Sequence, residues 1–130
     1  AIDQGSNYKP LYDLDLSLKE KIETIAKEIY GADGVAFDGA AAKELAHIEE
    51  MRYGKMPVCI AKTPVSFSDD PSKLGAPSGF TLHVREVKVS AGAGFVVALT
   101  GKIMTMPGLP RRPAAERIDV DDEGNITGLF

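Results

Sequence analysis

The side chains best suited to chemistry gather in one irregular segment, 62–79, of this 130-residue chain. The segment follows a short apolar run and has no hydrophobic period of its own. Its hydroxyl, carboxylate and ammonium groups belong to Thr63, Ser66, Ser68, Ser78, Asp69, Asp70, Lys62 and Lys73. Open α/β sheets bind ligands just beyond the carboxyl ends of their strands, and compact domains rarely keep so long a structureless connection. We therefore expect a ligand-lining loop, with Thr63, Ser66, Ser68 and Asp69 as candidates; a purely structural turn region is the alternative.

A second irregular segment, "TMPGLPRRP" at 105–113, offers a contact surface instead of reactive groups. The candidate contact residues are Thr105, Met106, Pro107 and Leu109. Prolines stiffen this backbone, and the apolar side chains would line a pocket for a flat ring or carry the chain across a neighbouring domain. The sequence favours neither reading over the other.

No complete metal or nucleophile motif is visible in the sequence. His47 and His83 each lack a second histidine, a cysteine or an acid pair at ligand spacing, and "DVDDEG" lacks the glutamate that completes a calcium loop. "SAGAGF" at 90–95 lacks the third glycine of a dinucleotide loop, which favours a turn between strands. The single cysteine, Cys59, lies in an apolar run that predicts core packing. We predict no metal site and assign no catalytic residue.

Alternating helices and strands must position these segments. Ser17 begins a helix through a capping box with Glu20, and Gly31 ends it. A second helix is expected over about 39–52, with Asp38 as its N-cap. The predicted strands are 34–37, 56–61, 80–90 with a phase slip at Glu86, and 95–101, followed by a hairpin around 123–125.

This order of elements predicts an α/β fold in which two helices cover a mixed β-sheet, in two or three layers, with long irregular loops. The strand at 56–61 is apolar throughout, which is typical of a strand buried on both faces, and 95–101 is expected to be another buried strand. Residues 1–13 are expected to form a linker or an arm that leads into the fold. Residues 14–130 are expected to form one domain.

Composition narrows the range of functions. A hydrophobic content of 44% and a charged content of 26% are those of a soluble globular protein. A net charge of −4 argues against a nucleic-acid partner, and no apolar stretch is long enough to span a membrane. The absence of a signal-peptide pattern predicts a cytoplasmic location. The chain begins without methionine, so we expect it to be a piece of a longer protein.

Three blocks carry a family resemblance: "KEKIETIAKEIYGADGV", "PVCIAKTPVSFSDDPSKLGAPSGFTLHVREVKVSAGAGFVVALTGKIMTMPGLP" and "PAAERIDVDDEGNITGLF". They resemble the C-terminal end of formate–tetrahydrofolate ligases, also called 10-formyltetrahydrofolate synthetases, from about residue 8 to residue 130. The resemblance implies a one-carbon enzyme whose substrates are formate, ATP with Mg²⁺ and tetrahydrofolate. It implies that formate is phosphorylated to formyl phosphate and that the formyl group then passes to N10 of tetrahydrofolate.

The resemblance also implies what these residues lack. The family's phosphate-binding loop and pterin-clasping aromatic residues lie upstream, so we predict that the chain alone is inactive. Segments 62–79 and 104–110 would form one wall of a nucleotide and folate cleft that the upstream domains complete. A homotetramer is the expected assembly. The alternatives are a structural or oligomer-forming domain without ligand contacts, and a free-standing nucleotide-binding module.

Overall fold

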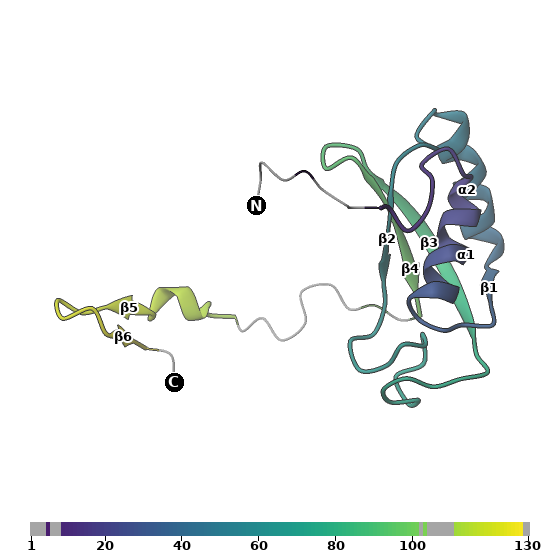
Figure 1. Ribbon diagram of the computed structural model, residues 1–130. Helices are drawn as coiled ribbons and strands as arrows, with labels where there is room; N and C mark the ends of the chain where they lie inside the picture. The colour runs from purple at the N-terminus through teal and green to yellow at the C-terminus, as the bar shows by residue number, and fades with distance from the viewer. Residues whose placement is uncertain (1–4, 6–8, 102, 104–110, 129–130) are drawn as a thin grey trace.

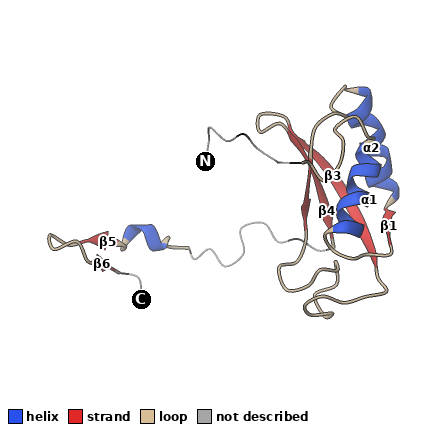
Figure 2. Cartoon of the chain, viewed as in Figure 1, coloured by secondary structure: helices blue, strands red, loops and turns tan. Residues whose placement is uncertain are grey.

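Two helices and a four-stranded sheet form the body of the chain (Figures 1 and 2). The structure is a computed structural model that describes residues 5, 9–101, 103 and 111–128. The elements of the body are α1 (Leu18–Glu28), β1 (Gly34–Phe37), α2 (Gly39–Glu50), β2 (Val58–Ala61), β3 (Thr81–Ser90) and β4 (Phe95–Thr100). A short 3₁₀ helix, η2 (Ala114–Glu116), and two short strands, β5 (Asp119–Val120) and β6 (Ile126–Thr127), follow. The predicted α/β class is confirmed.

Local signals in the sequence set the helix ends. The Ser17 hydroxyl accepts a hydrogen bond from the Glu20 amide at 3.3 Å, and the Glu20 carboxylate accepts one from the Ser17 amide at 2.9 Å, so the predicted capping box is confirmed. Gly31 has a φ of 69°, as a left-handed cap after α1 requires. Asp38 occupies the N-cap position of α2, but its side chain makes no capping hydrogen bond.

The sheet is mixed, in the order β1-β3-β4-β2. Strand β1 runs parallel to β3, β2 runs parallel to β4, and β3 and β4 are antiparallel. The register between β3 and β4 shifts between Val84 and Glu86, which confirms the predicted bulge. The carboxyl ends of β2 and β4 therefore meet the amino ends of β1 and β3 at one edge of the sheet, and the 62–79 loop lies there (Figure 1).

Both helices pack against the same face of the sheet. Their buried side chains form one core with alternate residues of β3 and β4: Leu18, Ile22, Ala41, Leu45, Ile48, Val84, Val87, Val96 and Ala98. The arrangement therefore has two layers, the simpler of the two predicted forms (Figure 2). Buried Lys21 sits beside this core and donates to the carbonyls of Gly54 at 2.6 Å and Met56 at 3.1 Å, which holds α1 against the turn before β2.

The opposite face of the sheet is open in the described part of the chain. Cys59 is exposed, and the β4 side chains between the buried positions are only half-buried. The prediction that Cys59 lies in the core is therefore wrong: strand alternation points it away from both helices. The prediction that 56–61 and 95–101 are buried on both faces is likewise not met within these residues.

The C-terminal residues form a hairpin, as predicted. Strands β5 and β6 pair antiparallel, and the Asp121 carboxylate accepts from the amides of Glu123 at 3.1 Å and Asn125 at 2.8 Å. These hydrogen bonds lower the pKa of Asp121, and those from Asn125 have the largest effect. Residues 111–127 are exposed throughout. The single-domain boundary at 14–130 stays a prediction. Among the described residues, neither helix has the length and apolar character needed to cross a bilayer.

Candidate functional site

The 62–79 loop begins with a cation that lies beside two neighbouring aromatic rings. The Lys62 ammonium lies 5.1 Å from the centre of the Tyr30 ring and 6.0 Å from that of Phe67. It donates to the carbonyl of Thr63 at 2.9 Å and to that of Ser66. Burial lowers the pKa of Lys62, and the charge of Asp69 opposes that shift. The backbone at the start of the loop is therefore hydrogen-bonded to Lys62, to which the sequence analysis gave no specific role.

Two buried serines hold the middle of the loop. Ser66 is 3% exposed and Ser68 is 1% exposed, and their hydroxyl oxygens lie 2.9 Å apart. The Ser68 hydroxyl donates to the Asp70 carbonyl and accepts from the Asp70 amide, each at 3.1 Å. The Phe67 amide donates to Gly75 at 2.8 Å, which ties the two arms of the loop together. These serines satisfy backbone groups that the absence of regular secondary structure would leave unpaired.

Asp69 joins the loop to the sheet. Its carboxylate accepts from the His83 backbone amide at 3.3 Å and lies 3.0 Å from His83 Nδ1. The Asp69 side chain is 15% exposed, whereas that of His83 is 56% exposed. On the other side, a Cβ added at Gly101 would lie 2.7 Å from the Asp69 carbonyl oxygen, so the end of β4 packs tightly against the loop. Asp69 thus contacts both central strands at this edge.

A groove of about 490 Å³ opens beside this contact. Its lining consists of Ser68, Asp69, Asp70, Lys73, Gly79, Phe80, Thr81 and His83. The lining includes two carboxylates, Asp69 and Asp70, but one ammonium, that of Lys73, so carboxylates outnumber ammonium groups there. Such a surface accepts hydrogen bonds from N–H donors more readily than it binds phosphate. Among the residues that the structure describes, no three of His, Cys, Asp or Glu come together as a metal site.

The structure places the predicted site residues unequally. Asp69 lines the groove, and half-buried Thr63 accepts from the Val65 amide at 3.4 Å. The Ser66 and Ser68 side chains point into the loop. Their contacts hold the shape of the loop, which is the structural alternative to lining a ligand. The candidates in the second segment, Thr105, Met106, Pro107 and Leu109, lie outside the described residues. Whether the named residues contact a ligand stays a prediction.

Two contributors escaped the sequence analysis. His83 was weighed only as a metal ligand, and its alternation with apolar neighbours indicated nothing about Asp69, fourteen positions earlier. Arg85 is an exposed residue of β3, and its guanidinium donates to the Gly101 carbonyl at 2.9 Å. That bond ties β3 to the residue that follows β4. Because β2 and β4 run parallel, Ala61 and Thr100 lie at the same end of the sheet.

Comparison with known proteins shows to which family the chain belongs. The family model described as formate–tetrahydrofolate ligase matches residues 1–130. The chain belongs to the formate–tetrahydrofolate ligase family. It is 62% identical over 129 residues to the formate–tetrahydrofolate ligase of Symbiobacterium thermophilum, and 58% identical over 130 residues to that of Paenarthrobacter aurescens.

These alignments cover 99% and 100% of this chain but 23% of each relative. The chain therefore spans less than a quarter of the length of the curated ligases that it matches. The family resemblance expected from the three sequence blocks is confirmed. The groove beside Asp69 is thus a feature of a formate–tetrahydrofolate ligase segment.

Proposed function

We propose that this chain is the C-terminal domain of an ATP-dependent ligase that joins formate to tetrahydrofolate. In this reaction a formate oxygen attacks the terminal phosphorus of MgATP, ADP leaves, and N10 of tetrahydrofolate then attacks the formyl carbon and displaces inorganic phosphate. Phosphorylation supplies the leaving group that a free carboxylate lacks. The single observation that carries the proposal is the family match over the whole chain, together with the names of the two relatives.

Within that enzyme, the 62–79 loop with 104–110 forms one wall of the substrate cleft. Only about 10 Å separates the end of β2 from the start of β3 across β4, a gap that three or four extended residues would bridge. The observed connection is far longer and is held in one shape by Lys62, the buried serines and Asp69. A long, ordered loop at the end of a sheet is typical of a binding surface.

The chemistry of the groove favours one part of the substrates. The carboxylates of Asp69 and Asp70 repel a triphosphate but accept hydrogen bonds from amino groups, which pterin and adenine both carry, and from the ring N–H groups of the pterin. The chain's role is accordingly to shape and orient, while upstream polypeptide holds the phosphates and the reacting groups. A cytoplasmic, homotetrameric enzyme is part of the same proposal.

Two assays test this proposal. The isolated chain, supplied with ATP, formate and tetrahydrofolate, is expected to form no 10-formyltetrahydrofolate; product above the uncatalysed background would contradict the inactivity of the chain. In the complete ligase, Asp69→Asn keeps a hydrogen-bond acceptor but removes the charge, whereas Asp69→Ala removes both. If the carboxylate contacts substrate, both variants raise KM for tetrahydrofolate or ATP, while Asp122→Ala, in the exposed hairpin turn, leaves KM unchanged.

One observation favours a second candidate, a structural or oligomer-forming domain. The Ser66 and Ser68 hydroxyls and the Asp69 carboxylate are already used within the chain. Under this alternative, Asp69→Asn would behave as wild type, and Asp69→Ala would change stability or the sedimentation coefficient of the assembly without a selective change in KM. The Asn and Ala variants together therefore separate the two functions.

A further inference from the structure

The open face of the sheet presents a continuous apolar strip. The pairing of β2 with β4 sets Cys59 beside Val97 and Ala61 beside Leu99, and Phe95 continues the strip along β4. All five side chains share the face opposite the helices, because the alternating positions Val96, Ala98 and Thr100 are buried on the helix side. We name this strip the open apolar face: Cys59, Ala61, Phe95, Val97 and Leu99.

A charged pair borders the open apolar face along β3. Lys88 lies opposite Val97, Glu86 lies opposite Leu99, and the two charged groups are 3.0 Å apart. Apolar residues over β2 and β4 with a polar margin on β3 are the composition of an interface core and its rim. A strand that has one face in water normally alternates apolar and polar residues. Neither Val58–Ala61 nor residues 95–99 show this alternation.

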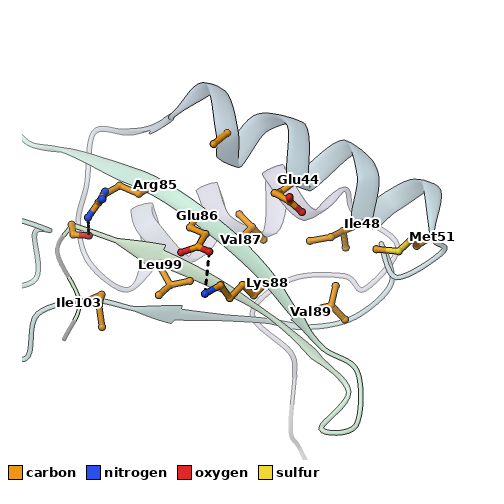
Figure 3. Close-up of a pocket in the computed structure, with 12 residues that line it drawn as sticks. Glu44, Ile48, Met51, Arg85, Glu86, Val87, Lys88, Val89, Leu99 and Ile103 are labelled. Atoms are coloured by element: carbon orange, nitrogen blue, oxygen red, sulfur yellow. Dashed lines mark hydrogen bonds and ion pairs between the residues drawn. The ribbon is translucent and has the colours of Figure 1, made fainter. Parts of the chain in front are cut away.

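The surface continues around the outer edge of β3. Strand β1 pairs only with Thr81–Val84, so in the described part of the chain no strand lies beside residues 85–90 on that side. A groove of about 820 Å³ follows this edge, where Ile48 and Met51 reach from α2 toward β3 and Leu99 and Ile103 lie away from the helix (Figure 3). An extended backbone beside an unpaired strand gains main-chain hydrogen bonds, which a flat ligand does not.

We propose that the open apolar face and the adjoining β3 edge are the docking surface for the upstream part of the same ligase polypeptide. This occupant follows from length: the relatives carry about three quarters of their residues outside the region matched here. It also follows from the strand compositions, which suit burial on both faces, whereas the described residues cover only one. The proposal rests on family membership and is independent of the role of the 62–79 loop.

Cys59 is a built-in reporter for this surface, because it is the single cysteine of the chain and is exposed. Maleimide labelling of the 130-residue chain is expected to modify Cys59 as fast as an unprotected thiol. In the complete ligase, labelling of the same cysteine, read by peptide mass spectrometry, should be about a hundredfold slower at every protein concentration. Labelling after denaturation checks that the thiol is intact.

A matched pair of variants separates docking from general damage. In the complete ligase, Val97→Glu places a charge on the open apolar face and should speed Cys59 labelling about tenfold or more, since a buried unpaired charge opposes docking. Ile29→Glu places the same charge at the end of α1, on the helix side, where the side chain is 53% exposed, and should leave labelling as in wild type. Exchange protection of the Val96 amide shows that each variant is folded.

Three results would overturn the proposal. Equal, fast labelling in the chain and in the complete ligase would show that the face stays open. Slow labelling already in the 130-residue chain would show that its own residues cover the face. Protection in the complete ligase that disappears on dilution would assign the face to a second copy of the protein.

Discussion

Removing one buried hydroxyl is expected to open the 62–79 loop without unfolding the sheet. Ser68→Ala deletes the donor to the Asp70 carbonyl, the acceptor for the Asp70 amide and the contact with the Ser66 hydroxyl. Each such hydrogen bond contributes about 1 kcal/mol net, and we count only the two to the Asp70 backbone, because the Ser66 hydroxyl keeps its hydrogen bond from the residue 68 amide at 3.0 Å. We therefore expect a loss of about 2 kcal/mol in the local free energy of opening, or about thirtyfold in the opening equilibrium.

Native-state hydrogen exchange measures this opening residue by residue. The amides of Phe67 and Gly75, which donate across the loop at 2.8 and 2.9 Å, should lose about thirtyfold protection. The Val96 amide, which donates to Pro57 at 2.9 Å beside the core, should exchange as in wild type. The loop and the core then open as separate units.

The control is the same substitution at Ser72, which also hydrogen-bonds Asp70 but is exposed, with 2.7 Å between its hydroxyl and the carboxylate. Ser72→Ala should change protection by no more than about twofold, since water replaces an exposed partner. Unchanged exchange at Phe67 and Gly75 in Ser68→Ala would refute the reasoning. An equal loss at Val96 would refute it too, because the loop would then unfold only with the sheet.

Two further substitutions test other contacts. Gly101→Ala should lower the free energy of unfolding by about 2 kcal/mol in chemical denaturation, because the φ of Gly101 is 63° and a Cβ there would meet the Asp69 carbonyl. Gly92 has open space around it, so Gly92→Ala should change the free energy of unfolding by less than about 0.5 kcal/mol. Similar effects of the two substitutions would contradict this prediction. Burial lowers the pKa of Lys21 below 10.5, so between the folded and unfolded values the unfolded chain binds more protons and stability rises with pH. The unfolding free energy of wild type minus that of Lys21→Met should accordingly increase from pH 8 toward the unfolded pKa of Lys21; a flat or falling difference would exclude this burial effect.

The sequence by itself determined the elements whose causes are local. The Ser17 capping box, the glycine cap at residue 31 and the strand bulge near Glu86 each arise from residues within one helical turn or one strand repeat of each other. The family resemblance came from the same linear information. The second helix ended at Glu50, short of the predicted 52, because end positions depend on weak capping preferences.

The tertiary structure alone decided which distant residues meet. Alternation along β2 and β4 predicted two faces for each strand, but only the placement of both helices on one side showed that Cys59 faces outward. Asp69 contacts His83 because β2 ends and β3 begins at the same end of the sheet. Lys62, which directly follows β2, contacts Tyr30, which lies just after α1. Spacing in the sequence encodes contacts within an element, whereas contacts between elements follow from topology, which the linear pattern leaves open.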